Sequence, residues 1–208
     1  MTSEPGVSDD WLVDRLAPRP VVEGDLIHRG KVWDLRGEVV DLGESQVLRE
    51  FVDHPGAVAV IALDEQDRVL LLQQYRHPVR HDLWEPPAGL LDVEGEELVL
   101  AAARELAEEA DLRAASWWRL VEVFTTPGGS NERIVVFLAR DLSAVPDHEL
   151  FERTDEEALM VPVWVPLDDA VDAVLAGRLH SPTTVTGVLA AAAARARGWS
   201  TLERVALG

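Results

Sequence analysis

The chain has 208 residues, of which 47% are hydrophobic, and it carries a formal net charge of −19 with a pI near 4.6. This length and apolar fraction are sufficient for one globular domain with a sizeable core and a small additional subdomain. The negative charge argues against nucleic acid or an anionic membrane as a partner, because both require a basic surface that displaces counterions.

The sequence contains no cysteine, which excludes disulfide bonds and thiol catalysis. No run of apolar residues approaches the roughly 18 that a membrane-spanning helix requires. The first residues, MTSEPGVSDDW, are acidic and polar and lack the pattern of a signal peptide. We therefore expect a soluble cytoplasmic protein.

The first part of the chain predicts a small sheet. Residues 1–20 are expected to form a flexible N-terminus. Residues 21–54 contain short alternating runs that predict an antiparallel sheet subdomain, with turns at Gly30, Gly37 and Gly43. The runs cover residues 25–28, 32–35, 39–42 and 46–52. Such a sheet has little core of its own and must pack against another surface, whereas residues 55–208 are expected to form the main domain.

Two apolar runs, 56–63 and 69–74, predict strands at the centre of a sheet, because continuous apolar character indicates burial on both faces. Arg76 follows the second strand. An arginine in this position can make forked contacts with phosphate oxygens, which lysine cannot. A solvent-exposed arginine at a strand end is the alternative interpretation.

The histidines do not predict a zinc site. His54, His77 and His81 lack a helix-face spacing beside a carboxylate, and scattered loop histidines are more often surface groups.

The segment LWEPPAGLLD, residues 83–92, carries two adjacent prolines. They stiffen the chain and remove backbone donors, so that the Ala88 carbonyl can be presented as a fixed metal ligand. Trp84 precedes the prolines and is interpreted as a core or wall residue in preference to one that stacks on substrate.

Residues 97–110 predict an amphipathic helix with an apolar stripe at Leu98, Ala102, Leu106 and Ala110. Glu105, Glu108 and Glu109 gather on another face at spacings of three and four. Like charges at this spacing repel and call for a cation, and oxygen ligands suit Mg²⁺ or Mn²⁺ better than zinc. A solvated acidic face is the alternative.

The loop TTPGGSNE, residues 125–132, lies between two predicted strands at 117–124 and 133–138. Around Gly128 and Ser130 it offers open backbone amides and a hydroxyl, which suit a ligand that carries phosphate or ribose. A hairpin loop without a function is the alternative.

The last part of the chain predicts one strand, at 160–165, and two helices. The first helix begins at Pro166 and stops at Gly177, and the second runs from an N-cap at Ser181 to about Ala196. Together with the earlier elements, these helices predict an α+β protein.

The segment from residue 89 to residue 112 resembles the signature of the Nudix hydrolases, G-x5-E-x7-R-E-U-x-E-E-x-G-U, in which U is aliphatic. The matching residues are Gly89, Glu96, Arg104, Glu105, Leu106, Glu108, Glu109 and Leu112. The sequence departs from the signature at two places. Six residues separate Gly89 from Glu96, and Asp111 stands in place of the second glycine. Because aspartate tolerates the left-handed conformation, we expect Asp111 to end the helix in it.

This resemblance implies an α/β/α sandwich with a mixed sheet, preceded by the small N-terminal antiparallel sheet. It also implies a hydrolase whose Mg²⁺ or Mn²⁺ is held by the Ala88 carbonyl, Glu105, Glu108 and Glu109. Glu105 and Glu109 count among the catalytic candidates. Glu96 and Arg104 would brace the loop through an ion pair.

Several features resemble the branch of the family that hydrolyses ADP-ribose to AMP and ribose 5-phosphate. The resemblance implies that Arg76 binds phosphate, that Glu85 lies near the substrate and that the 125–132 loop lines the terminal ribose pocket. In that branch the general base is a glutamate on an acidic loop before a late strand. Glu157 matches this position best, and Glu156 is second.

The same branch exchanges its N-terminal sheet across a homodimer. We therefore expect a homodimer in which Arg49, and less strongly Trp33, contacts the adenosine end of the substrate. A surface salt bridge is the alternative for Arg49. Two other functions stay open: hydrolysis of another nucleoside diphosphate sugar, such as a GDP-sugar, and a noncatalytic Nudix module that binds a ligand.

Overall fold

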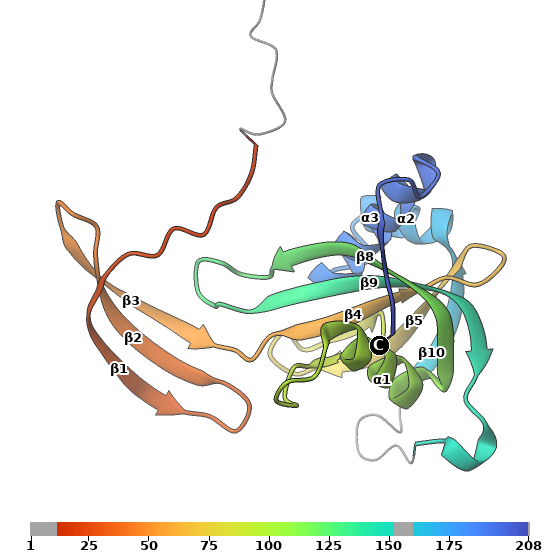
Figure 1. Cartoon of the computed structure of the whole chain (residues 1–208), viewed down its shortest axis with the longest axis horizontal. Helices are drawn as coiled ribbons and strands as arrows, with labels where there is room; N and C mark the ends of the chain where they lie inside the picture. Colours follow the sequence, from red (N-terminus) through yellow and green to blue (C-terminus); the bar gives the residue numbers. More distant parts are fainter. Residues whose placement is uncertain (1–11, 152–159, 208) are drawn as a thin grey trace, which may run out of the picture. The chain divides into compact units, whose positions relative to one another are not determined.

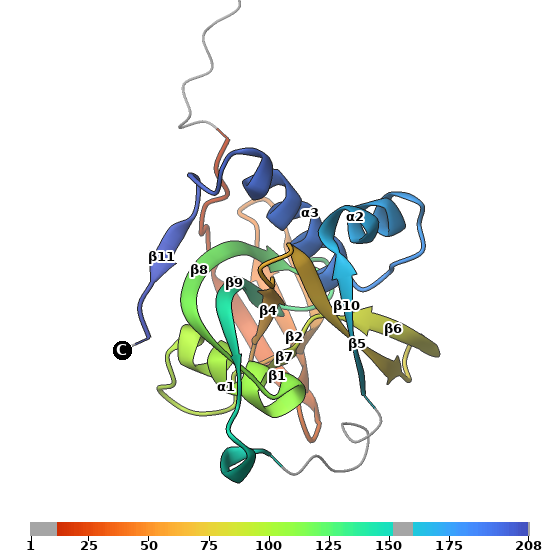
Figure 2. The same cartoon turned by 90° about the vertical axis from the view of Figure 1, so that its right-hand side faces the viewer.

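The computed structural model describes residues 12–151 and 160–207. It contains two compact units, Met1–Phe51 and Val52–Gly208, whose strands and α-helices are labelled between them in Figures 1 and 2. The first unit is a three-stranded sheet in the order β1-β2-β3. Its strands are β1 (Val21–Arg29), β2 (Asp34–Asp41) and β3 (Gln46–Asp53), and β1 pairs with β2 in antiparallel orientation.

The predicted turn at Gly37 is wrong, because β2 continues through this glycine. Gly37 lies opposite Asp25 in the ladder and is buried. A Cβ at Gly37 would lie 3.0 Å from the Cδ1 of Ile27. Glycine at this position therefore accommodates the close packing of a side chain from β1, and the two predicted runs on either side of it form one strand.

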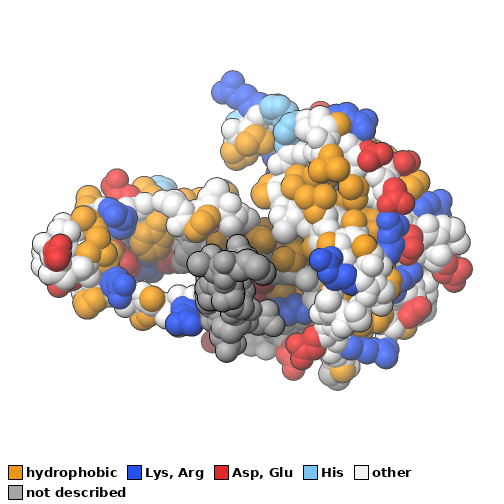
Figure 3. All heavy atoms as spheres, turned by 90° about the horizontal axis from the view of Figure 1, so that it is seen from above, with side chains coloured by type: hydrophobic (Ala, Val, Ile, Leu, Met, Phe, Trp, Pro, Cys, Tyr) orange, Lys and Arg blue, Asp and Glu red, His pale blue; other side chains and the backbone are white. Residues whose placement is uncertain are grey.

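The N-terminal sheet has almost no buried core, as its sequence predicts. All nine residues of β1 are exposed, and Leu48 of β3 is 59% exposed. Figure 3 shows hydrophobic side chains among charged ones on the surface of this unit.

The second unit contains a mixed five-stranded sheet in the order β11-β8-β9-β4-β7. β4 (Ala57–Ala62) runs parallel to β9 (Arg133–Ala144), and the other neighbours are antiparallel. The remaining strands are β7 (Ala88–Leu90), β8 (Leu112–Phe124) and β11 (Glu203–Val205). A separate antiparallel sheet, β10-β5-β6, consists of β10 (Val161–Pro166), β5 (Arg68–Arg76) and β6 (His81–Glu85).

The helices cover both faces of the five-stranded sheet (Figures 1 and 2). α1 (Leu98–Ala110) packs on one face, where its apolar stripe meets Val58, Val60 and Ala62 of β4. α2 (Leu167–Leu175) and α3 (Pro182–Ala196) pack with the alternate residues Ala57, Ala59 and Ile61. A short 3₁₀ turn, η1 (Asp147–Glu149), follows β9. The predicted α/β/α sandwich with a mixed sheet is confirmed.

No helix within residues 12–151 and 160–207 has the length and apolar character needed to cross a membrane.

Candidate active site

The strand β7 places the Ala88 carbonyl at an edge of the five-stranded sheet. The N–H of Val60 donates to the carbonyl of Pro87 at 2.8 Å, and Ala59 lies opposite Ala88 in the antiparallel register. Hydrogen-bonded and non-hydrogen-bonded pairs alternate in such a ladder, so Ala59 and Ala88 form a non-hydrogen-bonded pair. Both backbone groups of Ala88 therefore point away from β4. Because β7 is an edge strand, they point out of the sheet.

The helix α1 brings its glutamates to this edge. Glu109 accepts a hydrogen bond from the Ala88 N–H, with 2.9 Å between the nitrogen and Oε2. Glu105 is 9% exposed and packs so closely on Gly89 that a Cβ there would overlap with its carboxylate. Glycine at position 89 thus leaves room for the end of the Glu105 side chain beside the strand.

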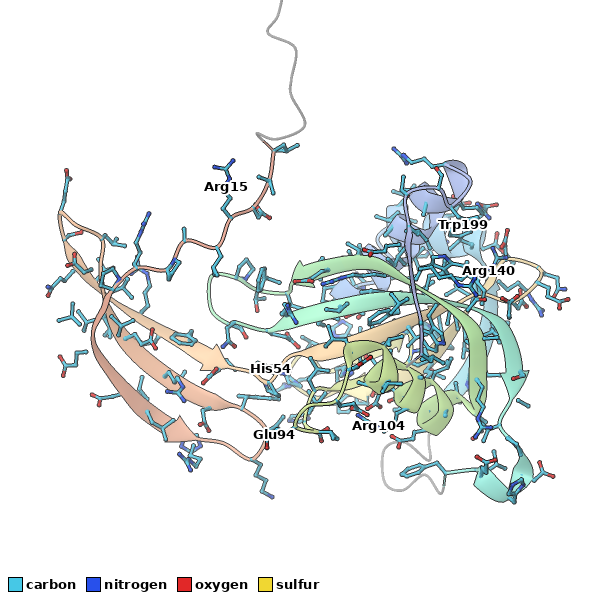
Figure 4. All side chains as sticks on the ribbon, in the orientation of Figure 1. Arg15, His54, Glu94, Arg104, Arg140 and Trp199 are labelled. Atoms are coloured by element: carbon cyan, nitrogen blue, oxygen red, sulfur yellow. The ribbon has the colours of Figure 1, made fainter. Side chains whose placement is uncertain are left out.

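Arg104 joins the acidic residues of this region and is labelled in Figure 4. It donates to the two carboxylate oxygens of Glu96 at 3.2 and 3.1 Å, to Glu105 at 2.5 Å and to Glu108 at 3.3 Å. The hydrogen bonds with Glu96 raise the pKa of Arg104 well above its ordinary value, although burial lowers it. The predicted ion pair between Glu96 and Arg104 is confirmed.

Burial raises the pKa of Glu105 above its ordinary value, and the negative charges of Glu108 and Asp92 act in the same direction. Arg104 opposes this shift but does not cancel it. The carboxylate of Glu105 is therefore harder to ionise than one in water, and a bound cation would stabilise its ionised form.

These side chains do not converge on one point in the conformation described. Among residues 12–151 and 160–207, no three acidic or histidine side chains are arranged to hold a metal ion. Glu105 and Glu108 face Arg104, and Glu109 faces Ala88. The donor set nevertheless fits a hard divalent cation, because three carboxylates and an outward-pointing carbonyl offer only oxygen. To bind it, the glutamates would have to rotate away from these partners.

Asp111 ends α1 in the left-handed conformation, with φ 55° and ψ 33°. Its N–H donates to the Ala107 carbonyl at 3.2 Å, and its own carbonyl accepts from Val145 at 2.8 Å. The conformation predicted for this departure from the signature is confirmed. It turns the chain directly from α1 into β8.

A second polar cluster lies where β5 and β6 pair. Glu85 is 8% exposed, and its Oε2 accepts hydrogen bonds from Gln74 Nε2 at 2.8 Å and from Arg76 Nε and Nη2 at 3.0 and 2.7 Å. The side chain of Arg76 is 47% exposed. Only two prolines separate Glu85 from Ala88, so this cluster is connected closely to the edge of β7.

The chain also matches the profile of one known protein family. The profile of the NUDIX domain matches residues 53–184, which is more than half of the chain. The chain belongs to the NUDIX family.

Relatives with known names cover most of the chain. An ADP-ribose pyrophosphatase from Mycobacterium tuberculosis is 42% identical over 170 residues, which cover 81% of both chains. An ADP-ribose pyrophosphatase from Bacillus subtilis is 34% identical over 163 residues, which cover 78% of this chain and 86% of the relative. A crystal structure of an ADP compounds hydrolase is similar with a TM-score of 0.71 and 17% identity, and the match covers 89% of this chain and 99% of that one. The last similarity supports the NUDIX fold.

The 125–132 loop is fastened to the end of β3 and to His54, which follows that strand. The hydroxyl of Ser130 donates to the Val52 carbonyl at 3.3 Å and accepts from the Glu132 N–H at 3.0 Å. The Asn131 carboxamide accepts from the N–H of His54 at 2.7 Å. The Ser130 hydroxyl thus stabilises the conformation of the loop. At Gly128 a Cβ would meet no atom within 4 Å, so crowding does not explain that glycine.

The structure places the other predicted residues as follows. Trp84 is partly buried against the core, and its carbonyl accepts from Thr184 Oγ1 at 2.6 Å. Arg49 and Trp33 belong to the N-terminal unit, where Arg49 donates to the Leu48 carbonyl at 3.0 Å. Glu156 and Glu157 lie outside the described residues.

Two residues of the NUDIX domain acquire a role only in the structure. Gln74 reaches Glu85, and Asn131 fixes the 125–132 loop. A signal for Gln74 exists in its spacing from Arg76, because residues two apart on a strand share a face. The contact of Asn131 spans 77 positions in the sequence, and no local pattern indicates it.

A cavity of about 540 Å³ lies at the other end of β4, where Leu63 and Asp64 follow the strand. Trp118 and Trp164 contribute to its wall together with Arg68 and Arg140. Both arginines have carboxylate partners, Asp64 for Arg68 and Asp67 for Arg140. Figure 4 shows Arg140 beside Trp199. This cavity is remote from Ala88 along β4 and contains none of the predicted site residues.

Proposed function

We propose that the protein hydrolyses the diphosphate bond of ADP-ribose and releases AMP and ribose 5-phosphate. The observation that carries the proposal is the edge of β7, where the outward-pointing backbone of Ala88 meets the glutamates of α1. Membership of the NUDIX family supports a pyrophosphohydrolase that depends on a divalent cation. The two ADP-ribose pyrophosphatases among the relatives support the choice of substrate.

The Ala88 carbonyl, Glu105, Glu108 and Glu109 would hold Mg²⁺ or Mn²⁺. A divalent cation bound there neutralises charge on a diphosphate and lowers the pKa of a coordinated water. The fold determines where these ligands lie. Gly89 allows Glu105 to approach the strand, and a hydrogen bond holds Glu109 beside Ala88, from where rotation of its side chain would bring the carboxylate to the cation. Glu105 and Glu109 are therefore our catalytic candidates on α1.

Other residues would contact the substrate or its pocket. We assign Arg76 to a phosphate, Trp84 and Glu85 to the wall of the pocket, and Gly128 and Ser130 to the loop beside the terminal ribose. The general base would be Glu157, or Glu156 in second place. Neither nucleic acid nor a membrane is proposed as a partner, because the net charge of −19 disfavours polyanionic surfaces. The absence of cysteine supports a cytoplasmic location.

We further propose a homodimer in which residues 21–54 form a subdomain exchanged between protomers, while residues 55–208 form the catalytic domain. The exposed apolar side chains of the N-terminal sheet support this proposal, because a sheet without a core gains stability from a partner surface. Arg49 would then contribute to binding of the adenosine end of the substrate.

The test is a phosphatase-coupled assay of phosphate release with Mg²⁺ or Mn²⁺. The substrates are ADP-ribose, GDP-mannose, NADH, diadenosine polyphosphates and nucleoside triphosphates. We expect turnover that requires the cation and is highest with ADP-ribose. Glu109→Gln should reduce kcat by roughly 100-fold or more, whereas Glu94→Gln, at an exposed loop position, should not.

If the enzyme prefers another diphosphate, the proposed reaction would stand but its substrate would be that compound instead of ADP-ribose. Binding of these compounds without any turnover would instead indicate a noncatalytic module and would refute the proposed activity.

A further inference from the structure

We propose that Glu85 and Gln74 are positioning residues, which hold the guanidinium of Arg76 in one orientation for contact with a substrate phosphate. This proposal rests on the proposed hydrolysis of a diphosphate. It gives Glu85 a different role from that of a group in contact with the substrate: its carboxylate acts through Arg76.

Burial explains why the carboxylate of Glu85 needs these partners. The residue is 8% exposed, and an ionised carboxylate taken out of water is costly unless it is paired and hydrogen-bonded. Oε2 accepts all three hydrogen bonds described for this side chain, two from Arg76 and one from Gln74. The carboxylate of Glu85 is therefore paired with side chains of the neighbouring strand β5.

The strand register explains how one carboxylate reaches both donors. Glu85 lies opposite Leu72 in the ladder of β5 and β6. Side chains two residues apart share a face of a strand, so Gln74 and Arg76 follow Leu72 on the same side of β5. Both side chains extend back along the strand to Glu85. Gln74 and Arg76 thus both donate to the same oxygen, Oε2 of Glu85.

The two contacts of Arg76 fix the plane of its guanidinium. Nε and Nη2 both donate to Oε2 of Glu85, whereas the contacts described for this side chain do not involve Nη1. Its side chain is 47% exposed, which leaves the outer donors accessible to a ligand. A planar fork held in this way suits two oxygens of a phosphate, and a lysine ammonium could not replace it.

The connection to β7 fixes where this fork lies relative to the glutamates of α1. Glu85 is joined to Ala88 through Pro86 and Pro87, and the Pro87 carbonyl accepts from Val60 at 2.8 Å. Three residues span at most about 10 Å, and proline restricts the backbone further. Glu85 therefore ties the position of Arg76 to the edge where the cation ligands of the proposed site meet.

A double-mutant cycle tests this role with Arg76→Ala, Glu85→Gln and the double variant. We expect each single substitution to lower kcat/KM for ADP-ribose roughly tenfold to hundredfold, mainly through KM, because a misplaced binding group loses its alignment. The double variant should be no worse than Arg76→Ala alone. Losses that multiply would overturn the proposal, because Glu85 would then act independently of Arg76.

Chemical rescue gives a readout that a purely structural role would not change. Added ethylguanidinium should restore part of the activity of Arg76→Ala, and it should fail in the double variant, which lacks the carboxylate that orients it. Equal rescue in both variants would contradict the proposed role of Glu85.

Two further variants complete the design. Gln74→Leu should cost several-fold in kcat/KM in the wild-type background and nothing more in Glu85→Gln, and it carries the test if Glu85→Gln does not fold. Asp67→Asn is the matched control, because it removes the carboxylate partner of Arg140 at the other end of β4. We expect Asp67→Asn to leave kcat/KM unchanged; a loss as large as that of Glu85→Gln would show that any lost ion pair produces the effect.

The proposal can fail separately from the proposed function. If the enzyme prefers another diphosphate, the cycle is measured with that compound. If no diphosphate is hydrolysed, the proposed function fails, and nuclear magnetic resonance of the Arg76 Nε–H decides the positioning role. Protection of this proton from solvent exchange in the wild type and its loss in Glu85→Gln would support the role, and equal exchange rates would refute it.

Discussion

At the scale of single residues, the contact between Gly89 and Glu105 sets a steric limit on the candidate site. A Cβ at position 89 would overlap with a carboxylate that is itself buried. We expect Gly89→Ala to displace Glu105, to weaken binding of Mn²⁺ and to lower the free energy of unfolding by about 1–3 kcal/mol. Urea unfolding and a Mn²⁺ titration measure the two effects.

The matched control for this prediction is Gly129→Ala, because a Cβ at Gly129 would meet no atom within 4 Å. Its unfolding should follow that of the wild type. A Gly89→Ala protein with unchanged stability and unchanged Mn²⁺ affinity would show that Glu105 can move aside without loss.

The raised pKa of Glu105 leads to a prediction on pH. Burial disfavours its ionised form, so the folded protein binds a proton more tightly at this group than the unfolded chain does. The contribution of Glu105 to stability therefore falls as the pH rises from the ordinary carboxyl pKa through the raised one. We expect Glu105→Gln, which cannot ionise, to gain stability relative to the wild type across this interval when EDTA removes metal ions.

Urea unfolding of both proteins at a series of pH values measures this difference. It should be small in acid and should level off above the raised pKa. The prediction would be contradicted if the free energies of unfolding of the wild type and of Glu105→Gln differed by the same amount at every pH. Saturating Mn²⁺ should reverse the order at neutral pH, because a bound cation stabilises the carboxylate of Glu105 and is bound less tightly by glutamine.

At the scale of elements, α1 shows what a local pattern can predict. Its apolar stripe, its end at Asp111 and the ion pair between Glu96 and Arg104 all follow from residues close together in the sequence. Helix periodicity and end conformation are local properties, so the residues themselves contain the information. The resemblance to the signature added the expectation that the face with Glu105, Glu108 and Glu109 binds the cation.

Contacts between distant strands explain what the sequence could not predict. The residues around Gly37 predict a turn there. Its packing against Ile27 instead depends on the register of β1 and β2. The three residues of β11 form a strand only because they pair with β8. Gln74 likewise gains its role from β6, where the register brings Glu85 within reach. Strand pairing is nonlocal, and residue type alone does not determine it.

The 125–132 loop gives a prediction at the same scale. Asn131 accepts from the His54 N–H and donates to Asp53, which fastens the loop that follows β8 to the end of β3. We expect Asn131→Ala to reduce the free energy of unfolding by about 1–2 kcal/mol and to raise KM for ADP-ribose. Hydrogen exchange of the loop amides should accelerate.

Gln66→Ala is the control for Asn131→Ala, because it removes an exposed amide from the turn between β4 and β5. It should leave the exchange of the loop amides unchanged. Unaltered loop protection in Asn131→Ala would mean that the backbone contacts of Val52 suffice to hold the loop.

At the scale of the whole molecule, the N-terminal sheet carries the prediction on assembly. Light scattering should give the mass of a dimer at assay concentration. Leu48 is 59% exposed, and we expect Leu48→Glu to shift the protein toward monomers by placing a charge in the interface. The matched control is Leu175→Glu in α2, where the leucine is 73% exposed.

A monomeric wild type would refute the exchanged sheet, and a dimer that tolerates Leu48→Glu would place the interface elsewhere. If the dimer is required for the adenosine end of the substrate, the Leu48→Glu protein should lose affinity for ADP-ribose while its fold is retained. Circular dichroism checks the fold.

The outward-pointing backbone of β7 also affects how copies of the protein meet. A strand edge with open donors and acceptors can recruit a strand from another molecule, which leads to aggregation. Here the edge strand is three residues long, and Glu109 occupies the N–H of Ala88. Pairing with a strand of another molecule would break the hydrogen bond between Ala88 and Glu109. It would also bring that strand close to the negative charge of α1. The acidic helix therefore disfavours the addition of a foreign strand to this edge of its own sheet, and the same side chain, Glu109, is also a proposed cation ligand.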